Sequence, residues 1–170
     1  MPDYALANSL AADALDLWEA GQLETAVDRY SRAIAAVPGY PDWHSQYACV
    51  LQALGRHEEA TREYETALAL VLAQAESEVD PSVKVARYFL ADHLTKWGGA
   101  AKALDVLAPA VSAIPDDWLI CAAQAKALHA VGRLREAKLT AERAMANAGS
   151  EAKRADLAES LRVVLAAADG

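Results

Sequence analysis

The chain has 170 residues, of which 54% are hydrophobic, and its 24 acidic and 16 basic residues give a formal net charge of −8. This length suits one domain with a buried core. A negative charge of this size repels nucleic-acid phosphates and anionic lipid headgroups, so neither nucleic acid nor a membrane is an expected partner. The longest apolar run, residues 67–73, is much shorter than the ~18 residues of a membrane-spanning helix.

The first residues and the cysteines favour a cytoplasmic location. The sequence opens Met1-Pro2-Asp3, without the basic stretch and apolar run that make a signal peptide. The chain has two cysteines, Cys49 and Cys121. Without a secretion signal, two isolated cysteines are expected to be reduced thiols. We therefore expect a cytoplasmic protein.

Apolar residues recur with the period of an α-helix along nearly the whole chain, and no alternating pattern indicates a strand. Helix-stopping residues, chiefly glycine and proline, divide this pattern into segments. In chain order, the predicted helices are 4–20, 23–36, 41–54, 57–78, 81–97, 100–113, 117–130, 134–147 and 151–167. The sequence therefore predicts an all-α fold.

Four glycines between these helices mark an internal repeat. Gly21 and Gly55 lie 34 residues apart, as do Gly98 and Gly132, while the gap in the middle is nine residues longer. A glycine here can adopt the left-handed conformation that ends a helix. Alanines stand five positions after each glycine, where two helices are expected to cross: Ala26, Ala60, Ala103 and Ala137.

Tyr30 and Tyr64 stand nine positions after the first two of these glycines, and Pro38 and Pro115 stand seventeen positions after the first and third. This spacing of glycine, alanine, tyrosine and proline resembles the tetratricopeptide repeat, a 34-residue helix-turn-helix unit. The resemblance implies a right-handed α-α superhelix, with four helix-turn-helix repeats and a C-terminal capping helix. In a single domain spanning 1–170, the expected parts are repeats 7–40, 41–74, 84–117 and 118–151, an insertion at 75–83 and a capping helix at 152–168.

The insertion follows the second repeat. Helix-stopping signals appear there only at Asp80, which can cap a helix, and Pro81, which suits its first position. We therefore expect residues 75–83 to lengthen the facing ends of two helices. The result would be a projecting hairpin whose acidic tip carries Glu76, Glu78 and Asp80.

Two features of the C-terminal half also depart from a regular repeat. Pro109 lies inside the predicted helix 100–113, where it removes one backbone hydrogen bond and should kink the helix. After the fourth repeat, an apolar stripe runs opposite a charged one, as expected of a helix that covers the bare end of the last repeat. The stripe consists of Ala155, Leu157, Leu161, Val164 and Leu165.

By the same resemblance, the first helix of each repeat lines a concave groove. The second, fifth, ninth and twelfth residues of each repeat face this groove. Tyr88 and Trp18 are candidate anchors there, although Trp18 could equally pack on a neighbouring helix. Aromatic anchors beside hydrogen-bonding groups are typical of peptide grooves. The candidate groove residues are Asn8, Trp18, Ser45, Gln52, Tyr88, Asp92, Thr95, Lys126 and His129.

Lys126 and His129 could receive a carboxylate or could form a solvated surface pair. Co-chaperones of this family hold the C-terminal carboxylate of heat-shock chaperones with Lys, Asn and Arg at set groove positions. The corresponding residues carry no positive charge in this chain, which excludes a receptor of that type: Ala11, Leu15, Gln46, Val85 and Phe89. The whole groove set is mixed, apolar at both ends and polar in the middle. Its remaining positions are Ala11, Leu15, Asp42, Cys49, Val85, Leu119 and Ala122.

No pattern predicts catalysis, a cofactor or a metal site. The histidines lack metal-ligand spacing, and His44 and Cys49 are five residues apart, which turns them to different sides of a helix. No glycine-rich phosphate loop follows a strand. Trp43 and Trp118, each after a Pro-Asp turn, are interpreted as packing on the preceding helix. We therefore expect that the protein is not an enzyme.

The resemblance instead implies a protein-protein interaction module, an adaptor or scaffold that binds a peptide or protein segment in the concave groove. One alternative is a dedicated chaperone or neutralising partner for a secreted protein, because small acidic tetratricopeptide chaperones of type III secretion resemble the chain in size and charge. Another is a self-assembling structural protein that forms a homodimer.

Overall fold

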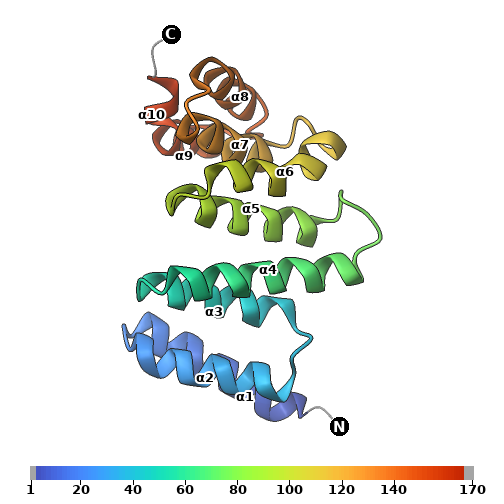
Figure 1. Ribbon diagram of the computed structural model, residues 1–170, viewed down its shortest axis with the longest axis vertical. Helices are drawn as coiled ribbons and strands as arrows, with labels where there is room; N and C mark the ends of the chain where they lie inside the picture. The colour runs from blue at the N-terminus through green and yellow to red at the C-terminus, as the bar shows by residue number, and fades with distance from the viewer. Residues whose placement is uncertain (1–2, 167–170) are drawn as a thin grey trace. The chain divides into compact units, whose positions relative to one another are not determined.

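The computed structural model of the chain describes residues 3–166, and every regular element within them is an α-helix (Figure 1). The predicted all-α fold class is therefore confirmed. No helix in this range combines the length and the apolar character needed to cross a membrane. The helices are α1 (Tyr4–Glu19), α2 (Leu23–Ala36), α3 (Pro41–Ala53), α4 (His57–Gln74), α5 (Pro81–Lys96), α6 (Ala100–Ala113), α7 (Trp118–Ala130), α8 (Leu134–Ala146), α9 (Glu151–Ser160) and α10 (Arg162–Leu165).

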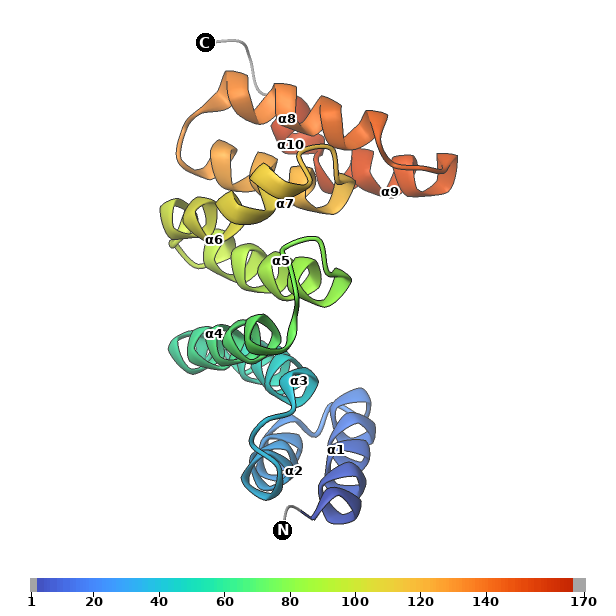
Figure 2. The same cartoon turned by 90° about the vertical axis from the view of Figure 1, so that its right-hand side faces the viewer.

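The chain divides into two compact units, residues 1–75 and 76–170. In the first unit, α1 pairs with α2 and α3 pairs with α4, and α2 also packs on α3. In the second unit, α5 pairs with α6 and α7 pairs with α8 (Figure 2). There α7 also packs on α5 and α6, while α9 and α10 pack on α8. Each pair is one helical hairpin of the predicted repeat.

The glycines end the first helix of each hairpin as predicted. At the end of α1, the N–H of Gly21 donates to the carbonyl of Trp18 at 2.9 Å, and the N–H of Gln22 donates to that of Leu17 at 2.8 Å. This pair of bonds satisfies carbonyls that a helix end otherwise leaves unpaired. It requires a left-handed residue, and the φ angles are positive at all four repeat glycines: Gly21, Gly55, Gly98 and Gly132.

Small residues allow the helices of each hairpin to pack closely. The alanines five positions after the repeat glycines are fully buried: Ala26, Ala60, Ala103 and Ala137. Trp43 lies in the core of the first unit, which α1, α2 and α3 form together. It shares this cluster with Tyr30 and Ala33 of α2, which agrees with the prediction that Trp43 packs on the preceding helix. In the second unit, the core joins α7 and α8 to the apolar side of α9 and α10.

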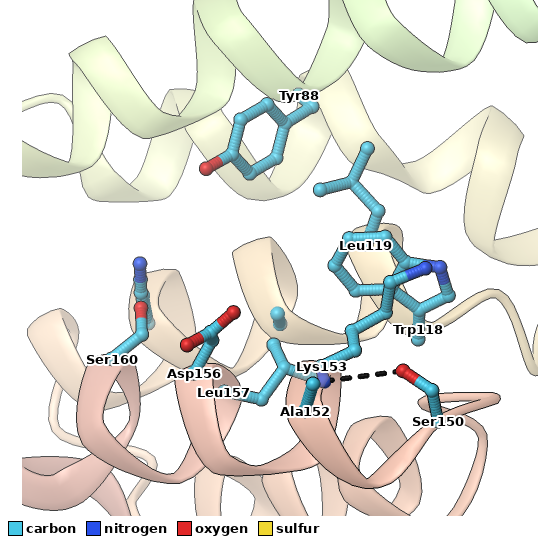
Figure 3. Close-up of a pocket in the computed structure, with 11 residues that line it drawn as sticks. Tyr88, Trp118, Leu119, Ser150, Ala152, Lys153, Asp156, Leu157 and Ser160 are labelled. Carbon is cyan, nitrogen blue, oxygen red and sulfur yellow. Dashed lines mark hydrogen bonds between the residues drawn. The ribbon is translucent and has the colours of Figure 1, made fainter.

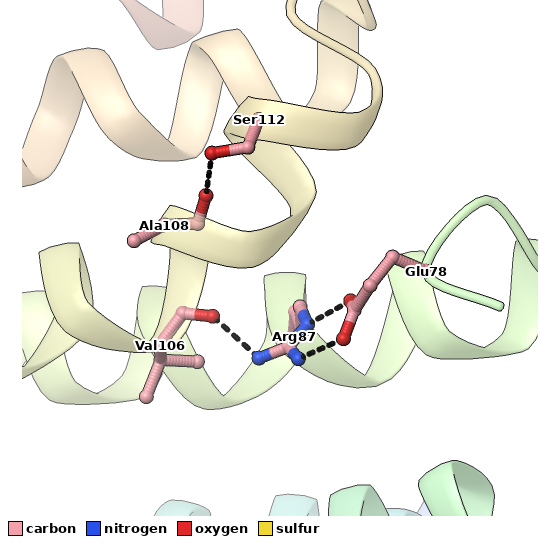
Figure 4. Close-up of polar contacts among 5 residues, drawn as sticks. All are labelled: Glu78, Arg87, Val106, Ala108 and Ser112. Carbon is pink, nitrogen blue, oxygen red and sulfur yellow. Dashed lines mark hydrogen bonds and ion pairs between the residues drawn. The ribbon is translucent and has the colours of Figure 1, made fainter.

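The segment after α4 differs from the prediction. We expected a helix to residue 78, but α4 ends at Gln74 and the chain is extended at Ala75. Beyond it, the carboxylate of Glu78 folds back onto the guanidinium of Arg87 in α5, nine residues later in the chain (Figure 4). The expected acidic tip is therefore wrong for Glu78, whereas Asp80 caps α5 as predicted.

Arg87 also reaches the helix that contains Pro109. Its Nη1 donates to the carbonyl oxygen of Val106 in α6 at 2.7 Å (Figure 4). The helix α6 continues through Pro109, which has no N–H to donate to the carbonyl of Asp105. The expected kink at Pro109 stays a prediction.

The predicted capping helix is not one continuous helix. It is interrupted at Leu161, and α9 and α10 lie on either side. Leu157 of α9, Leu161 itself and Val164 of α10 are all buried in the same core cluster. Ala155 of the predicted stripe, in contrast, is exposed. Residues 167–168 of the predicted capping helix lie outside the described residues.

Candidate functional site

The second unit contains a groove of about 490 Å³ between α5 and α9, with α7 behind them (Figure 3). Tyr88 reaches into it from α5. On α7, Leu119, Ala122 and Lys126 follow one another along a single helix face, as their spacing of three and four residues requires. This volume is within the range of sites that bind small molecules or a few side chains, roughly 300–1,000 Å³.

Apolar side chains form much of the groove. Trp118 and Leu119 contribute from the first turn of α7, and Leu157 contributes from α9. Trp118 also packs partly against the core of the second unit, so it has both a structural contact and a place in the groove. A partner side chain that entered here would therefore leave water for an apolar and aromatic surface.

The hydroxyl of Tyr88 points from α5 toward α9 (Figure 3). Burial raises the pKa of this phenol, and the negative charge of Asp92 raises it further, while Lys96 opposes the change. Tyr88 is therefore a neutral phenol at physiological pH. It can donate or accept a hydrogen bond at the mouth of the groove.

Lys153 is held at one end of the groove. Its Nζ lies 4.5 Å from the centroid of the Trp118 ring, a cation-π contact that keeps the ammonium beside apolar surface. The backbone N–H of Lys153 donates to the Oγ of Ser150 at 3.2 Å, which caps α9 (Figure 3). The start of α9 thereby fixes where this cation stands.

Lys126 provides a second cation on α7. Its Nζ is 4.0 Å from Oδ1 of Asp92, beyond hydrogen-bonding distance. The other oxygen of Asp92 is 2.6 Å from Nζ of Lys96. The carboxylate of Asp92 is therefore held mainly by Lys96, and Lys126 keeps donors available for another acceptor.

The structure brings only some of the predicted groove residues together. Tyr88 and Lys126 line the groove with Leu119 and Ala122, and Asp92 lies beside Lys126. Thr95 and His129 are half-buried further along α5 and α7. In the first unit, Asn8 is exposed and Trp18 packs against the core, while Ser45 and Gln52 are half-buried on α3. Their role in binding stays a prediction.

Sequence reasoning missed the side of the groove that α9 provides. The signal was present, because Lys153, Asp156 and Ser160 stand 34 residues after Leu119, Ala122 and Lys126. These three residues line the groove. The C-terminal helix therefore occupies the place of the first helix of a fifth repeat, at the same positions of the register, while its other side covers the core.

A polar cluster elsewhere ties the first two hairpins together. Nδ1 of buried His44 lies 2.7 Å from Oε2 of Glu63, and its Nε2 lies 2.9 Å from the carbonyl oxygen of Pro38. Burial lowers the pKa of His44, but the hydrogen bonds to Glu63 and Pro38 and the charge of Glu63 together outweigh it and raise the pKa. Both neighbours accept, so the doubly protonated ring satisfies them. In residues 3–166, no three His, Cys, Asp or Glu side chains gather as metal ligands.

Comparison with known proteins agrees with this architecture. Residues 17–76 match the tetratricopeptide repeat family model. No curated protein matches the chain by sequence. Among solved structures, MamA from Desulfovibrio magneticus RS-1 is 18% identical with a TM-score of 0.65, over 94% of this chain and 93% of that one.

Two further structures have the same fold. A protein from Podospora anserina with nearly identical TPR-like repeats of the kinesin light chain type is 20% identical with a TM-score of 0.70, over 98% of both chains. YrrB, described as a TPR protein with an unusual peptide-binding site, is 20% identical with a TM-score of 0.60, over 91% of this chain and 84% of that one.

Paired helices, left-handed glycine caps and a 34-residue spacing define the chain as a helical-repeat protein. The match over residues 17–76 and the shared fold identify the repeat. Residues 17–76 are therefore tetratricopeptide repeat, as the sequence resemblance predicted, and the fold of the chain is shared with solved tetratricopeptide-repeat structures.

Proposed function

We propose that this protein binds a short segment of a partner protein in the groove between α5 and α9. The tetratricopeptide fold is that of protein-protein interaction modules, and one structure with this fold is described as having a peptide-binding site. The observation that carries the proposal is the groove itself. It joins an apolar and aromatic surface to Lys126, Lys153 and Asp156 at its edges.

The size of the groove indicates how strong such binding is. Burying one or two apolar side chains of the partner contributes about 1.5–3 kcal/mol each. Association costs at least ~4 kcal/mol in lost freedom of motion. The apolar surface alone therefore supports only weak binding, and the charged groups at the edges have to add affinity and specificity.

Affinity capture from a lysate of the native host tests the proposal. Wild-type protein is compared with Tyr88→Ala, which removes a groove side chain, and with Tyr4→Ala, which removes a tyrosine that is 58% exposed in the first unit. We expect a partner that wild type and Tyr4→Ala retain and that Tyr88→Ala loses while it stays folded by circular dichroism.

A partner retained equally by all three proteins would contradict binding in this groove. Absence of a partner together with a dimeric solution mass would favour self-assembly. A captured partner that the host exports would favour a dedicated chaperone over an adaptor.

A further inference from the structure

We propose that the segment bound in this groove is extended and acidic, with two carboxylates four residues apart and an apolar side chain midway between them. This inference rests on the proposed binding function of the groove. Three features of the groove specify the chemistry of the partner: the hydrogen-bond donors of the groove, its local charge and the spacing of its two cations.

The groove offers more hydrogen-bond donors than acceptors. The ammonium of Lys153 lies over the Trp118 ring and makes no ion pair among the described residues. Lys126 stands 4.0 Å from a carboxylate that Lys96 already binds at 2.6 Å. Both cations border a half-enclosed apolar surface, where an unmet charge gains more from a partner than it does in open water. Carboxylates are the acceptors that bind an ammonium most strongly.

The local charge of the groove is opposite to that of the whole chain. Two lysines and one aspartate line the groove, and the charge of Asp92 beside Lys126 is offset by its ion pair with Lys96, whereas the chain carries a formal net charge of −8. Charges farther away than the Debye length, about 8 Å at physiological salt, are largely screened. Contacts inside the groove therefore decide the preference, and they favour a negative segment.

The positions of the two cations set the spacing. Lys153 stands over Trp118, the first residue of α7, and Lys126 follows eight residues later on the same helix. At ~1.5 Å per residue, the two ends of this stretch are about 12 Å apart along α7. An extended chain covers a similar distance in four residues, at ~3.4 Å each. Side chains at the first, third and fifth residues then point to one face.

An extended segment fits the groove better than a helix. A helix with its side chains is ~10–12 Å across. A groove of about 490 Å³ accommodates a few side chains instead. The middle side chain of an extended pentapeptide would meet Ala122, which is four residues from Trp118 and four from Lys126.

Three blocked pentapeptides, acetylated and amidated to remove their terminal charges, test the inference. Glu-Ala-Leu-Ala-Glu has the proposed spacing, Lys-Ala-Leu-Ala-Lys reverses its charge, and Ala-Glu-Leu-Glu-Ala brings the carboxylates closer together. Each is titrated into the ¹⁵N-labelled full chain at physiological salt. The indole N–H signal of Trp118, assigned with Trp118→Phe, reports binding.

We expect the first peptide to bind at least tenfold more tightly than either of the others. Lys126→Glu and Lys153→Glu should each weaken its binding at least fivefold and strengthen binding of the basic peptide. Loss of folding cannot reverse a preference in this way. Arg135→Glu on α8, an exposed residue that does not line the groove, makes the same change in net charge and should leave the preference unchanged.

Equal binding of the acidic and basic peptides would overturn this inference and leave the groove as a binding site. Equal binding of the two acidic peptides would overturn the spacing. If none of the three peptides binds, both the inference and the proposed function are contradicted.

Discussion

The guanidinium of Arg87 binds the carboxylate of Glu78 through two parallel hydrogen bonds, from Nε to Oε2 at 2.8 Å and from Nη2 to Oε1 at 2.6 Å. Arg87 is only 6% exposed, and its third bond goes to the carbonyl of Val106 (Figure 4). One side chain of α5 therefore fixes both the loop that precedes it and the neighbouring helix α6.

Replacing Glu78 by Gln should lower the free energy of unfolding by about 1–2 kcal/mol, because a buried guanidinium then lacks its anionic partner. The full cost of breaking a buried pair is not expected, since the side chain of Glu78 is 31% exposed. Urea unfolding measures the change. Glu76→Gln, at an exposed residue of the same loop, should be nearly neutral, and an equal loss in the two variants would refute the role of the contact.

Gly55→Ala should destabilise the protein by about 1–2 kcal/mol, because its φ of 75° is unfavourable for a residue with a Cβ. An added Cβ at Gly55 meets nothing within 4 Å, so the cost is conformational. Gly39→Ala is the matched control, because its added Cβ also meets nothing and its φ is not positive. In thermal unfolding, Gly55→Ala should therefore have a lower melting temperature than Gly39→Ala. Equal melting temperatures would count against the left-handed cap.

These two predictions differ in how far the sequence reveals their basis. The conformation of Gly55 follows from a local rule, since a glycine after an amphipathic segment can end a helix. The end of α4 follows no local rule, because the apolar pattern continues to Val79 whereas the helix ends at Gln74, ahead of the contact between Glu78 and Arg87. A contact between side chains on different elements is not visible in the periodicity of either one.

The sequence likewise reveals one part of the groove and not the other. Positions on α5 and α7 such as Tyr88 and Lys126 follow from the repeat register. Lys153 and Asp156 were missed because the terminal helix was interpreted only as a cover for the core, although the 34-residue spacing continues into it. The stacking of Lys153 over Trp118 depends on how α9 packs beside α7, which spacing alone does not specify.

Stability should depend on pH through His44. Its pKa in the folded protein is raised, so its contribution is complete below its unfolded pKa of about 6.5 and is lost as pH rises through the folded pKa. Urea unfolding of wild type and His44→Gln should therefore show a difference that is constant well below pH 6.5 and shrinks as the pH rises above about 6.5. Glu63→Gln should flatten the profile in a similar way, because it removes the carboxylate that stabilises the imidazolium. A difference that grows with pH would contradict this assignment.

Leu161→Ala should cost about 2–5 kcal/mol, because Leu161 is fully buried in the core of the second unit and its truncation leaves a cavity. Val163→Ala, two residues later, is the control, since Val163 is 60% exposed and should change stability by less than ~0.5 kcal/mol. Calorimetry of both variants tests whether the C-terminal helices cover the core. Similar losses of stability in the two variants would mean that the C-terminal helices do not cover the core.

Site-specific photocrosslinking in the native host tests the central claim, that a partner binds in the groove, most directly. A photoreactive residue is placed at Ser160, an exposed position that lines the groove, or at Leu139, an exposed position on α8 that does not line it. The proposed function predicts a single protein adduct from position 160 and none from position 139, identified by mass spectrometry. An adduct from position 139 alone, or none from either position, would contradict it.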